Sequence, residues 1–455
     1  MKYFVLLLFV LFTFAACQNQ PDKNENNAAN IEKPNIIFIM VDDLGYADLG
    51  AYGGELINTN NIDQLAAEGI RFTQAYAGAP VCAPSRSVLM TGQHTGHTTV
   101  RGNFAKVGGT PPQGRLPLQP KDVTVAEVLK QGGYVTGITG KWGLGEPRTS
   151  GIPNNQGFDQ WFGYLNQRHA HTYYPKYVWH NQDSVVLKGN LEGKDETYVH
   201  DLFTDFALQF IENNSDTTFF LYLPYTIPHS DLVVPSLGEY ADKDWEEKEK
   251  IYAAMVTRMD RDIGKIVQLL QDEGIEENTM IFFCSDNGAA SRWEGRFNSS
   301  GRLRGYKRDL YEGGIRTPMI VKYPPKIPKG AIDSTNYWYF ADVLPTLADV
   351  AGVPIPENIN GVSVKSIIYG NDQPELLDRF LYWEFYEKGF QQAVRWKQWK
   401  AIKLAPGKEW LLYNLVEDLA EQKNIANEHP QVLDTIISYV DTARVMSPHW
   451  PVMLN

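Results

Sequence analysis

The most chemically distinctive residues stand in the segment Cys82-Ala83-Pro84-Ser85-Arg86, where a thiol, a proline and a guanidinium group alternate with small side chains. Proline fits the first turn of a helix, so we predict that the cysteine lies at a helix N-terminus, where the helix dipole is positive. A side chain in that position is suited to contact an anionic ligand or to act as an activated nucleophile.

Carboxylate and amide side chains follow two predicted buried strands. Asp42 and Asp43 come directly after one apolar run (residues 35–41), and Asp286 and Asn287 come directly after another. Taken alone, each pair is typical of a solvated turn. In an open α/β sheet, however, ligands bind beyond the carboxyl ends of the strands. Together the two pairs therefore predict a shared site for a hard cation, Ca²⁺ or Mg²⁺.

A family resemblance connects these segments. Residues 82–92, CAPSRSVLMTG, match without a gap the first signature of the type I sulfatases of the alkaline-phosphatase superfamily, and residues 140–145, GKWGLG, resemble the second signature. The resemblance extends from Pro34 to the segment LYNLVEDLAEQKNIA near the C-terminus. It implies a sulfuric ester hydrolase, and the substrate that we expect is a sulfated carbohydrate.

The resemblance also implies two cofactors. In the family the cysteine of the first signature is oxidised to Cα-formylglycine, so we expect a formylglycine-generating (sulfatase-maturing) enzyme as a partner. A bound Ca²⁺, in preference to Mg²⁺, would take oxygen ligands from five positions: Asp42, Asp43, converted Cys82, Asp286 and Asn287.

The remaining catalytic roles are implied in the same way. Arg86 would hold the hydrated formylglycine, and Lys141 and Lys307 would bind sulfate oxygens. His229 would act as the general acid that protonates the leaving alcohol. One position departs from the family pattern, because many relatives carry a His where this chain has Gly143. That His assists the formylglycine during sulfate release, so water or another His must replace it here.

Substrate contacts are expected from two loops. Residues 163–174 are rich in Arg, His and Tyr, which suit hydroxyl groups and the faces of sugars, and a second loop follows the first signature. The residues that we predict to bind substrate are Arg101, Asn103, Arg168, His169 and His171. Each is equally consistent with a structural role in its loop.

Two other functions stay open. A phosphoester or phosphonate hydrolase of the same superfamily would use nearly the same site. A non-catalytic surface glycan-binding lipoprotein belongs to a different class, and it predicts damaged catalytic positions. Here every main catalytic position is filled except Gly143.

A large sheet is needed to position these residues. Four apolar runs predict buried strands, at residues 35–41, 134–139, 219–224 and 280–285. A capping box at Thr124 and Glu127 predicts a short helix, and apolar spacings of three and four predict a long helix over residues 245–274. We expect an α/β fold: a large, mostly parallel sheet sandwiched by helices (residues 34–370), then a smaller C-terminal subdomain of antiparallel sheet plus helix (residues 371–455).

Composition limits the functional classes further. The chain has 455 residues, of which 43% are hydrophobic and 21% charged, with a net charge of -12 and three cysteines. These values are typical of a globular protein, disfavour general nucleic-acid binding and exclude a disulfide-built scaffold. Residues 1–17 resemble a bacterial lipoprotein signal peptide, and residues 18–33 a flexible tether. We therefore expect an exported protein with a lipid anchor on Cys17, in the periplasm or at the surface of a Gram-negative-type bacterium.

Overall fold

The computed structural model describes residues 33–106 and 113–452. The predicted signal peptide (residues 1–17) and all but the last residue of the predicted tether lie outside the described residues. No helix in the described ranges is both long enough and apolar enough to cross a membrane.

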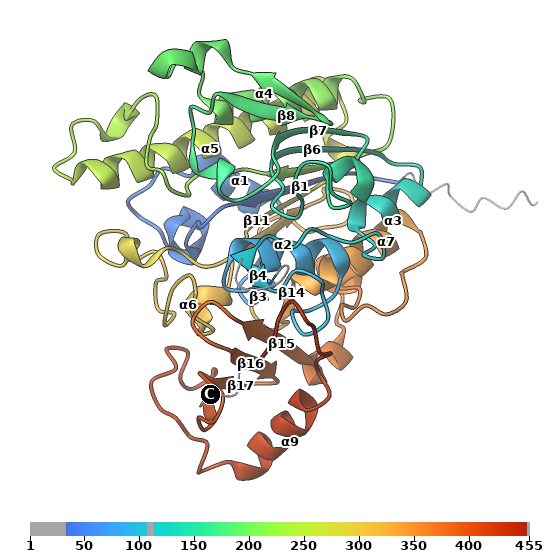
Figure 1. Ribbon diagram of the computed structural model, residues 1–455, viewed down its shortest axis with the longest axis vertical. Coiled ribbons are helices and arrows are strands. Elements are labelled where there is room, and N and C mark those ends of the chain that lie inside the picture. Colours follow the sequence, from blue (N-terminus) through green and yellow to red (C-terminus); the bar gives the residue numbers. More distant parts are fainter. Residues whose placement is uncertain (1–32, 107–112, 453–455) are drawn as a thin grey trace, which may run out of the picture. The chain divides into compact units, whose positions relative to one another are not determined.

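A mixed, mostly parallel sheet, ten-stranded in the described part of the chain, forms the framework (Figure 1). Its strands, in spatial order, are β13 (Ala331–Asp333), β2 (Ile70–Phe72), β12 (Met319–Lys322), β11 (Thr279–Ser285), β1 (Asn35–Val41), β10 (Phe219–Pro224), β6 (Val135–Lys141), β7 (Gln160–Tyr164), β8 (Tyr177–His180) and β9 (Asp183–Val186). The central strands β11, β1, β10, β6 and β7 are parallel to one another. The predicted strand positions and the predicted fold class are confirmed.

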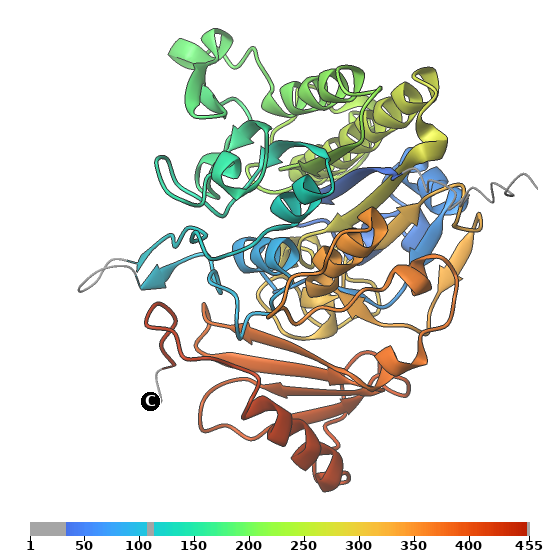
Figure 2. The same ribbon diagram turned by 90° about the vertical axis from the view of Figure 1, so that its right-hand side faces the viewer.

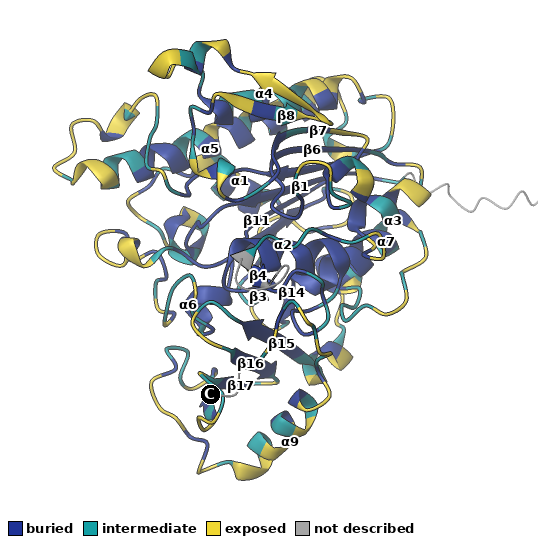
Figure 3. Ribbon diagram, viewed as in Figure 1, coloured by how far each residue is buried: buried dark blue, intermediate teal, exposed yellow. Residues whose placement is uncertain are grey.

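Helices cover both faces of this sheet. Successive side chains of β1 enter opposite cores, because a strand alternates its side chains with a period of two. Ile36, Phe38 and Met40 pack with one set of helices, α2 (Cys82–Thr91), α3 (Val125–Gln131) and α7 (Val343–Ala351). The other face of β1 packs with α1 (Asn60–Glu68), α4 (Val199–Glu212) and α5 (Glu247–Asp272). Figure 3 shows the central strands and α2 as buried along their length.

Two predicted helices are confirmed in detail. The helix expected over residues 245–274 is α5, which begins and ends two residues inside that range. Helix α3 follows the predicted capping box: Thr124 Oγ1 accepts the backbone N–H of Glu127, and the Glu127 carboxylate accepts the N–H of Thr124.

A separate antiparallel sheet follows toward the C-terminus (Figure 2). It contains β15 (Phe380–Phe385), β16 (Gln391–Trp396), β17 (Trp399–Lys403) and β18 (Leu411–Asn414), and α9 (Pro430–Val440) packs on it. The predicted combination of antiparallel sheet and helix is confirmed, whereas the boundary at residue 371 stays a prediction. Smaller elements are β3 (Ala75–Tyr76), β14 (Trp338–Tyr339), β4 (Ala105–Lys106), β5 (Gln113–Gly114), α6 (Glu312–Ile315) and α8 (Lys365–Ile368).

A buried ion network joins the C-terminal sheet to the rest of the chain. Lys400 of β17 lies 2.9 Å from Glu312 of α6 and 3.1 Å from Glu421, and all three side chains are fully buried. Burial raises the pKa of Glu312, but the positive charges of Lys400 and Arg316 outweigh burial and lower it to about 2. The ionised Glu312 therefore depends on its cationic partners.

Replacing this lysine by an apolar side chain should destabilise the fold. We expect Lys400→Met to lower the free energy of unfolding by about 3–5 kcal/mol, because two buried carboxylates lose a shared partner. Lys423→Met is the matched control, since Lys423 pairs with Glu428 at the surface and should change stability little. Urea unfolding of both variants measures the difference, and equal midpoints would contradict the prediction.

Candidate active site

The metal-ligand candidates meet where β1 and β11 end. These strands pair in parallel with Val41 opposite Ser285, so the residues that follow each strand lie side by side. Asp43 has a φ of 66°, a left-handed conformation that Asp adopts more readily than most residues, and its backbone N–H donates to Asp286 Oδ1 at 3.2 Å. Asp42 and Asp286 are fully buried. The predicted shared edge of the sheet is thus present in the structure.

Helix α2 brings Cys82 and Arg86 to the same place. The helix begins at Cys82, as predicted, and the thiol lies 3.5 Å from Asp42 Oδ1. Arg86, one turn later and fully buried, donates to Asp286 Oδ2 from Nε and Nη2 at 3.1 and 2.8 Å. A third bond, from Arg86 Nη1 to the carbonyl of Lys141 at 2.7 Å, connects α2 to the end of β6.

The thiol itself is not activated. Burial and the neighbouring Asp42 carboxylate raise the pKa of Cys82 to about 12, even though Lys141 and Lys307 lower it. The sulfur is therefore protonated at neutral pH. Because the thiolate is the nucleophilic form of cysteine, an unmodified Cys82 is poorly suited to attack a substrate.

Two lysines neutralise the carboxylates. Lys141 Nζ lies 2.5 Å from Asp42 Oδ2, and Lys307 Nζ lies 2.6 Å from both carboxylate oxygens of Asp43. Lys307 also donates to the Cys82 sulfur at 3.4 Å. Its pKa is raised far above the usual lysine value by the neighbouring carboxylates, against the opposing effect of burial. The pKa of Lys141 is also raised, because the Asp42 carboxylate outweighs the effect of burial. Both lysines are therefore charged, and Lys307 contacts the cysteine.

His229 completes this cluster. Its Nδ1 donates to the carbonyl of Ser230 at 2.7 Å, and its Nε2 lies 3.5 Å from Asp43 Oδ2. Burial lowers the pKa of His229 to about 4, although Asp42 and Asp43 oppose that effect. The imidazole is thus neutral at neutral pH, with Nε2 directed toward the carboxylates. The ring of His171 lies 4.6 Å from the ring of His229.

The oxygen atoms of this cluster fit a hard divalent cation. Potential ligand atoms of Asp42, Asp43, Cys82 and His229 all lie within 4.8 Å of one another. In addition, the Asn287 side-chain oxygen is buried with no hydrogen-bond partner among the described residues, while its Nδ2 donates to Asp43 Oδ1 at 2.8 Å. A buried carbonyl oxygen without a donor is unfavourable unless a cation or water satisfies it. This orphaned oxygen beside carboxylates is what a Ca²⁺ or Mg²⁺ site requires.

The cluster forms the floor of an open cavity of about 650 Å³. Five of the predicted catalytic and metal-binding residues line it: Asp43, Cys82, Lys141, His229 and Lys307. The model of the family described as Sulfatase matches residues 34–353, more than two thirds of the chain.

The chain belongs to the sulfatase family. It is a type I sulfatase of the alkaline-phosphatase superfamily, as the sequence predicts. A second family model, N-sulphoglucosamine sulphohydrolase, C-terminal, matches residues 305–442. The sulfatase is 31% identical to arylsulfatase G of Homo sapiens over 86% of this chain and 82% of the relative. It is 32% identical to the N-acetylgalactosamine-6-sulfatase of Canis lupus familiaris over 81% and 72%.

A solved structure resembles it over nearly the full length. The crystal structure of Ps i-CgsB in complex with k-i-k-neocarrahexaose superposes with a TM-score of 0.79 at 29% identity, covering 93% of this chain and 95% of that one. The overall arrangement of sheet and helices is therefore shared with a protein that is known in complex with a neocarrahexaose.

The predicted substrate residues divide into two groups. Asn103, Arg168 and His171 line the cavity of the sulfatase. Arg101 and His169 do not, contrary to the expectation. The buried Arg101 instead donates to the backbone carbonyls of Thr98 and Val445, and His169 packs with its ring 4.7 Å from that of Tyr164 and 4.4 Å from that of Tyr177. These contacts hold both side chains within the surrounding structure.

Further lining residues were not singled out from the sequence. Arg115, Arg292, Arg308 and Gln167 also line the cavity. Arg292 and Arg308 lie in the loops that follow β11, and the rule that ligands bind beyond strand ends could have indicated them. That rule does not indicate Arg115, because this residue directly follows β5, which pairs with β4 outside the main sheet.

The unusual Gly143 has a local steric reason. Its φ is +83°, and a Cβ there would lie 2.6 Å from Gln167 Nε2, which donates to the Gly143 carbonyl at 2.9 Å. In this sulfatase Gln167 therefore occupies the space that a side chain at position 143 would need.

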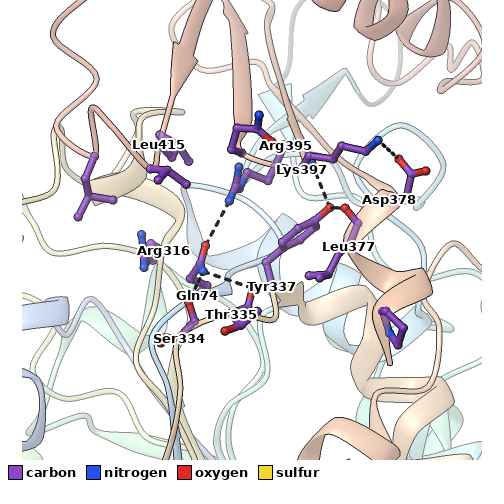
Figure 4. A pocket seen from close by; sticks show the side chains of 14 residues that line it. Gln74, Arg316, Ser334, Thr335, Tyr337, Leu377, Asp378, Arg395, Lys397 and Leu415 are labelled. Atoms are coloured by element: carbon purple, nitrogen blue, oxygen red, sulfur yellow. Dashed lines mark hydrogen bonds and ion pairs between the residues drawn. The ribbon is translucent and has the colours of Figure 1, made fainter. Parts of the chain in front are cut away.

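A second cavity, of about 680 Å³, shares no lining residue with the active-site cavity. Figure 4 shows the side chains that line it. Arg395 of β16 donates to Gln74 at 3.2 Å, and the Gln74 amide reaches the carbonyls of Ser334 and Thr335. None of the predicted catalytic, metal-binding or substrate-binding residues lines this cavity.

Proposed function

We propose that this sulfatase removes sulfate from a carbohydrate, with a formylglycine made from Cys82 as the nucleophile and Ca²⁺ as the bound metal. The observation that carries the proposal is the position of the Cys82 sulfur at the cavity floor, between the Asp42 carboxylate and the Lys307 ammonium group. The thiol is protonated there, so the site needs a different nucleophile at this position. Hydration of an aldehyde at Cys82 would supply a hydroxyl group for attack on sulfur.

The metal would be held by Asp42, Asp43, Asp286 and Asn287, together with the oxygen formed at Cys82. The orphaned oxygen of Asn287 supports this assignment, because a neutral carbonyl among carboxylates is a common Ca²⁺ ligand set. When bound, the ion would supply positive charge against the sulfate group undergoing transfer.

The surrounding cations would bind the sulfate ester. Arg86, Lys141 and Lys307 balance the three carboxylates at the cavity floor, so a divalent cation would leave an excess of positive charge. Lys141 and Lys307 then donate to sulfate oxygens, where charge-assisted hydrogen bonds stabilise the transferring group. Arg86 donates to Asp286 and thereby holds helix α2, which carries Cys82, in place.

His229 would act as the general acid. Its Nδ1 is occupied by the Ser230 carbonyl, so Nε2 is the atom that faces the reacting groups. The pKa of about 4 in the free site leaves His229 neutral, and the negative charge of a bound sulfate ester would raise that pKa. His229 would therefore take up its proton with the substrate and donate it to the departing oxygen.

A saccharide is the substrate class that the cavity supports. Its walls combine the amide of Asn103, the guanidinium group of Arg168 and the imidazole of His171, which suit the hydroxyl groups and faces of sugars. The relatives agree, since one is an N-acetylgalactosamine-6-sulfatase and another is known in complex with a neocarrahexaose. We further propose that a sulfatase-maturing enzyme converts Cys82, and that export and lipidation at Cys17 precede function.

Matched aryl esters test the reaction. We expect kcat/KM for 4-nitrophenyl sulfate to exceed that for 4-nitrophenyl phosphate by a factor on the order of 100, because the site is proposed to bind the sulfate transition state. A preference for phosphate or for a phosphonate monoester would favour the related hydrolases instead. Binding of sulfated saccharides with no turnover of any ester would favour a glycan-binding protein.

A further inference from the structure

Arginines line the active-site cavity in addition to the catalytic residues. Four of them line the cavity: Arg115, Arg168, Arg292 and Arg308. Two are compensated by carboxylates, since Arg115 lies 3.3 Å from Glu146 and Arg308 lies 2.9 Å from Glu387. Their charges are largely balanced within the protein.

The other two have no such compensation. Within residues 33–106 and 113–452, neither Arg168 nor Arg292 has a carboxylate within 4.0 Å. Arg292 donates through Nη2 to Ser230 Oγ at 3.2 Å, and Arg168 immediately precedes the short helical turn His169–His171. Both side chains are exposed to solvent and to the cavity.

Both arginines come from segments that lie next to the catalytic cluster. Ser230, which Arg292 contacts, directly follows His229 in the chain. On the other side, the ring of His171 lies 4.6 Å from that of His229. The two uncompensated guanidinium groups therefore come from the two segments that meet at His229, next to the position proposed for the leaving oxygen.

A single sulfate group does not account for these charges. Under the proposed function the scissile sulfate is held at the floor, by Lys141, Lys307 and the metal. Arg168 and Arg292 then remain as two guanidinium groups without a carboxylate partner among the described residues, in a chain whose net charge is -12. Guanidinium groups match the geometry of sulfate and carboxylate oxygens, to which they can donate two hydrogen bonds at once.

We infer that the substrate carries a second anionic group, a sulfate or a carboxylate, which Arg168 and Arg292 bind. This inference rests on the proposed function and makes it more specific: the sulfated carbohydrate carries at least two anionic groups. The cavity of about 650 Å³ falls within the size range of pockets that hold ligands larger than one sugar. The second group would lie on the alcohol side of the scissile ester, since both arginines flank His229.

Competition against 4-nitrophenyl sulfate tests the inference. A series of galactose disaccharides with one sulfate, with two sulfates, and with one sulfate plus one carboxylate would be used as inhibitors. We expect the two-anion members to inhibit wild type at least about tenfold more tightly than the one-sulfate member, as one or two charge-assisted bonds would produce. Comparison of the two-sulfate member with the sulfate-plus-carboxylate member shows whether the second anionic group is a sulfate or the carboxylate of a uronic acid.

Variants assign the preference to the two arginines. In the double variant Arg168→Gln/Arg292→Gln, the ratio of the inhibition constants of the one-anion and two-anion members should fall to about twofold. The variant Arg292→Lys keeps the positive charge and should retain part of the preference for two anions. Arg302→Gln is the matched control, because Arg302 is exposed and lines a different cavity. Thermal unfolding of each variant establishes that it is folded.

The outcomes separate this inference from the proposed function. Equal inhibition by the one-anion and two-anion members, or a preference that survives in the double variant, would overturn the inference. Absence of 4-nitrophenyl sulfate hydrolysis by the wild-type enzyme carrying both cofactors would instead overturn the proposed function.

Discussion

Cys82→Ala should reduce kcat/KM for sulfate esters by a factor on the order of 10⁵, the size expected when a covalent nucleophile is removed. Asp42, Lys141 and Lys307 would still surround the position, so substrate binding should weaken far less than turnover. The matched control is Cys284→Ala, because Cys284 is a buried cysteine of β11 with no hydrogen bond to the site. Kinetics on 4-nitrophenyl sulfate measure both variants.

Mass spectrometry of the wild-type protein accompanies these kinetics. The peptide that contains residue 82 should be lighter than its cysteine form by the difference between a CH₂SH and a CHO group. It should also react with a hydrazide and not with a thiol reagent. Full activity of a preparation in which residue 82 is entirely the unmodified thiol would contradict the proposed nucleophile.

The strands and the metal-ligand candidates were predictable because of burial. Strands covered on both faces are continuously apolar, which made β1 and β10 recognisable to the residue. The polar residues that interrupt such runs at the carboxyl end then stand out as candidates. That Asp42 and Asp286 lie side by side follows from the pairing of β1 with β11, which are more than two hundred residues apart. The rule that ligands bind beyond the carboxyl ends of parallel strands indicated a shared site, and the family resemblance agreed with it.

Two predicted substrate residues, Arg101 and His169, do not line the cavity because other contacts hold their side chains. Arg101 stands just beyond the first signature, but Val445, near the end of the chain, offers the carbonyl that holds its guanidinium group. His169 and His171 are two residues apart, yet only His171 reaches the cavity, because the short turn between them directs the His169 ring onto Tyr164. Tertiary packing decides which side chains of a loop reach the cavity, and the sequence of the loop alone does not reveal it.

Removal of the bound metal should cause the second large loss of activity. We expect chelation to lower kcat/KM by a factor on the order of 10³, because the charge that stabilises the transferring sulfate is lost and Lys141 and Lys307 turn back to Asp42 and Asp43. Added Ca²⁺ should restore activity at lower concentration than Mg²⁺. At 100 times its Kd, the ion should also stabilise the fold by about 2.7 kcal/mol, which thermal unfolding would detect. Unchanged activity after chelation, with no metal found by elemental analysis, would contradict the metal site.

The pH dependence of Ca²⁺ binding follows from Asp286. Burial and the neighbouring Asp42 raise the pKa of Asp286 to about 6 in the metal-free protein. Because Ca²⁺ binds the ionised carboxylate, affinity should be constant well above pH 6 and fall by up to tenfold per unit below it, as protons compete. Calorimetric titration at pH 7.5 and pH 5 measures this difference. Asp286→Asn removes the titrating group, so this variant should bind Ca²⁺ more weakly and with an affinity that does not depend on pH. Asp378→Asn is the control, because Asp378 is exposed and its replacement should leave the pH dependence of Ca²⁺ binding unchanged. A wild-type affinity that is equal at both pH values would mean that Asp286 does not bind the ion.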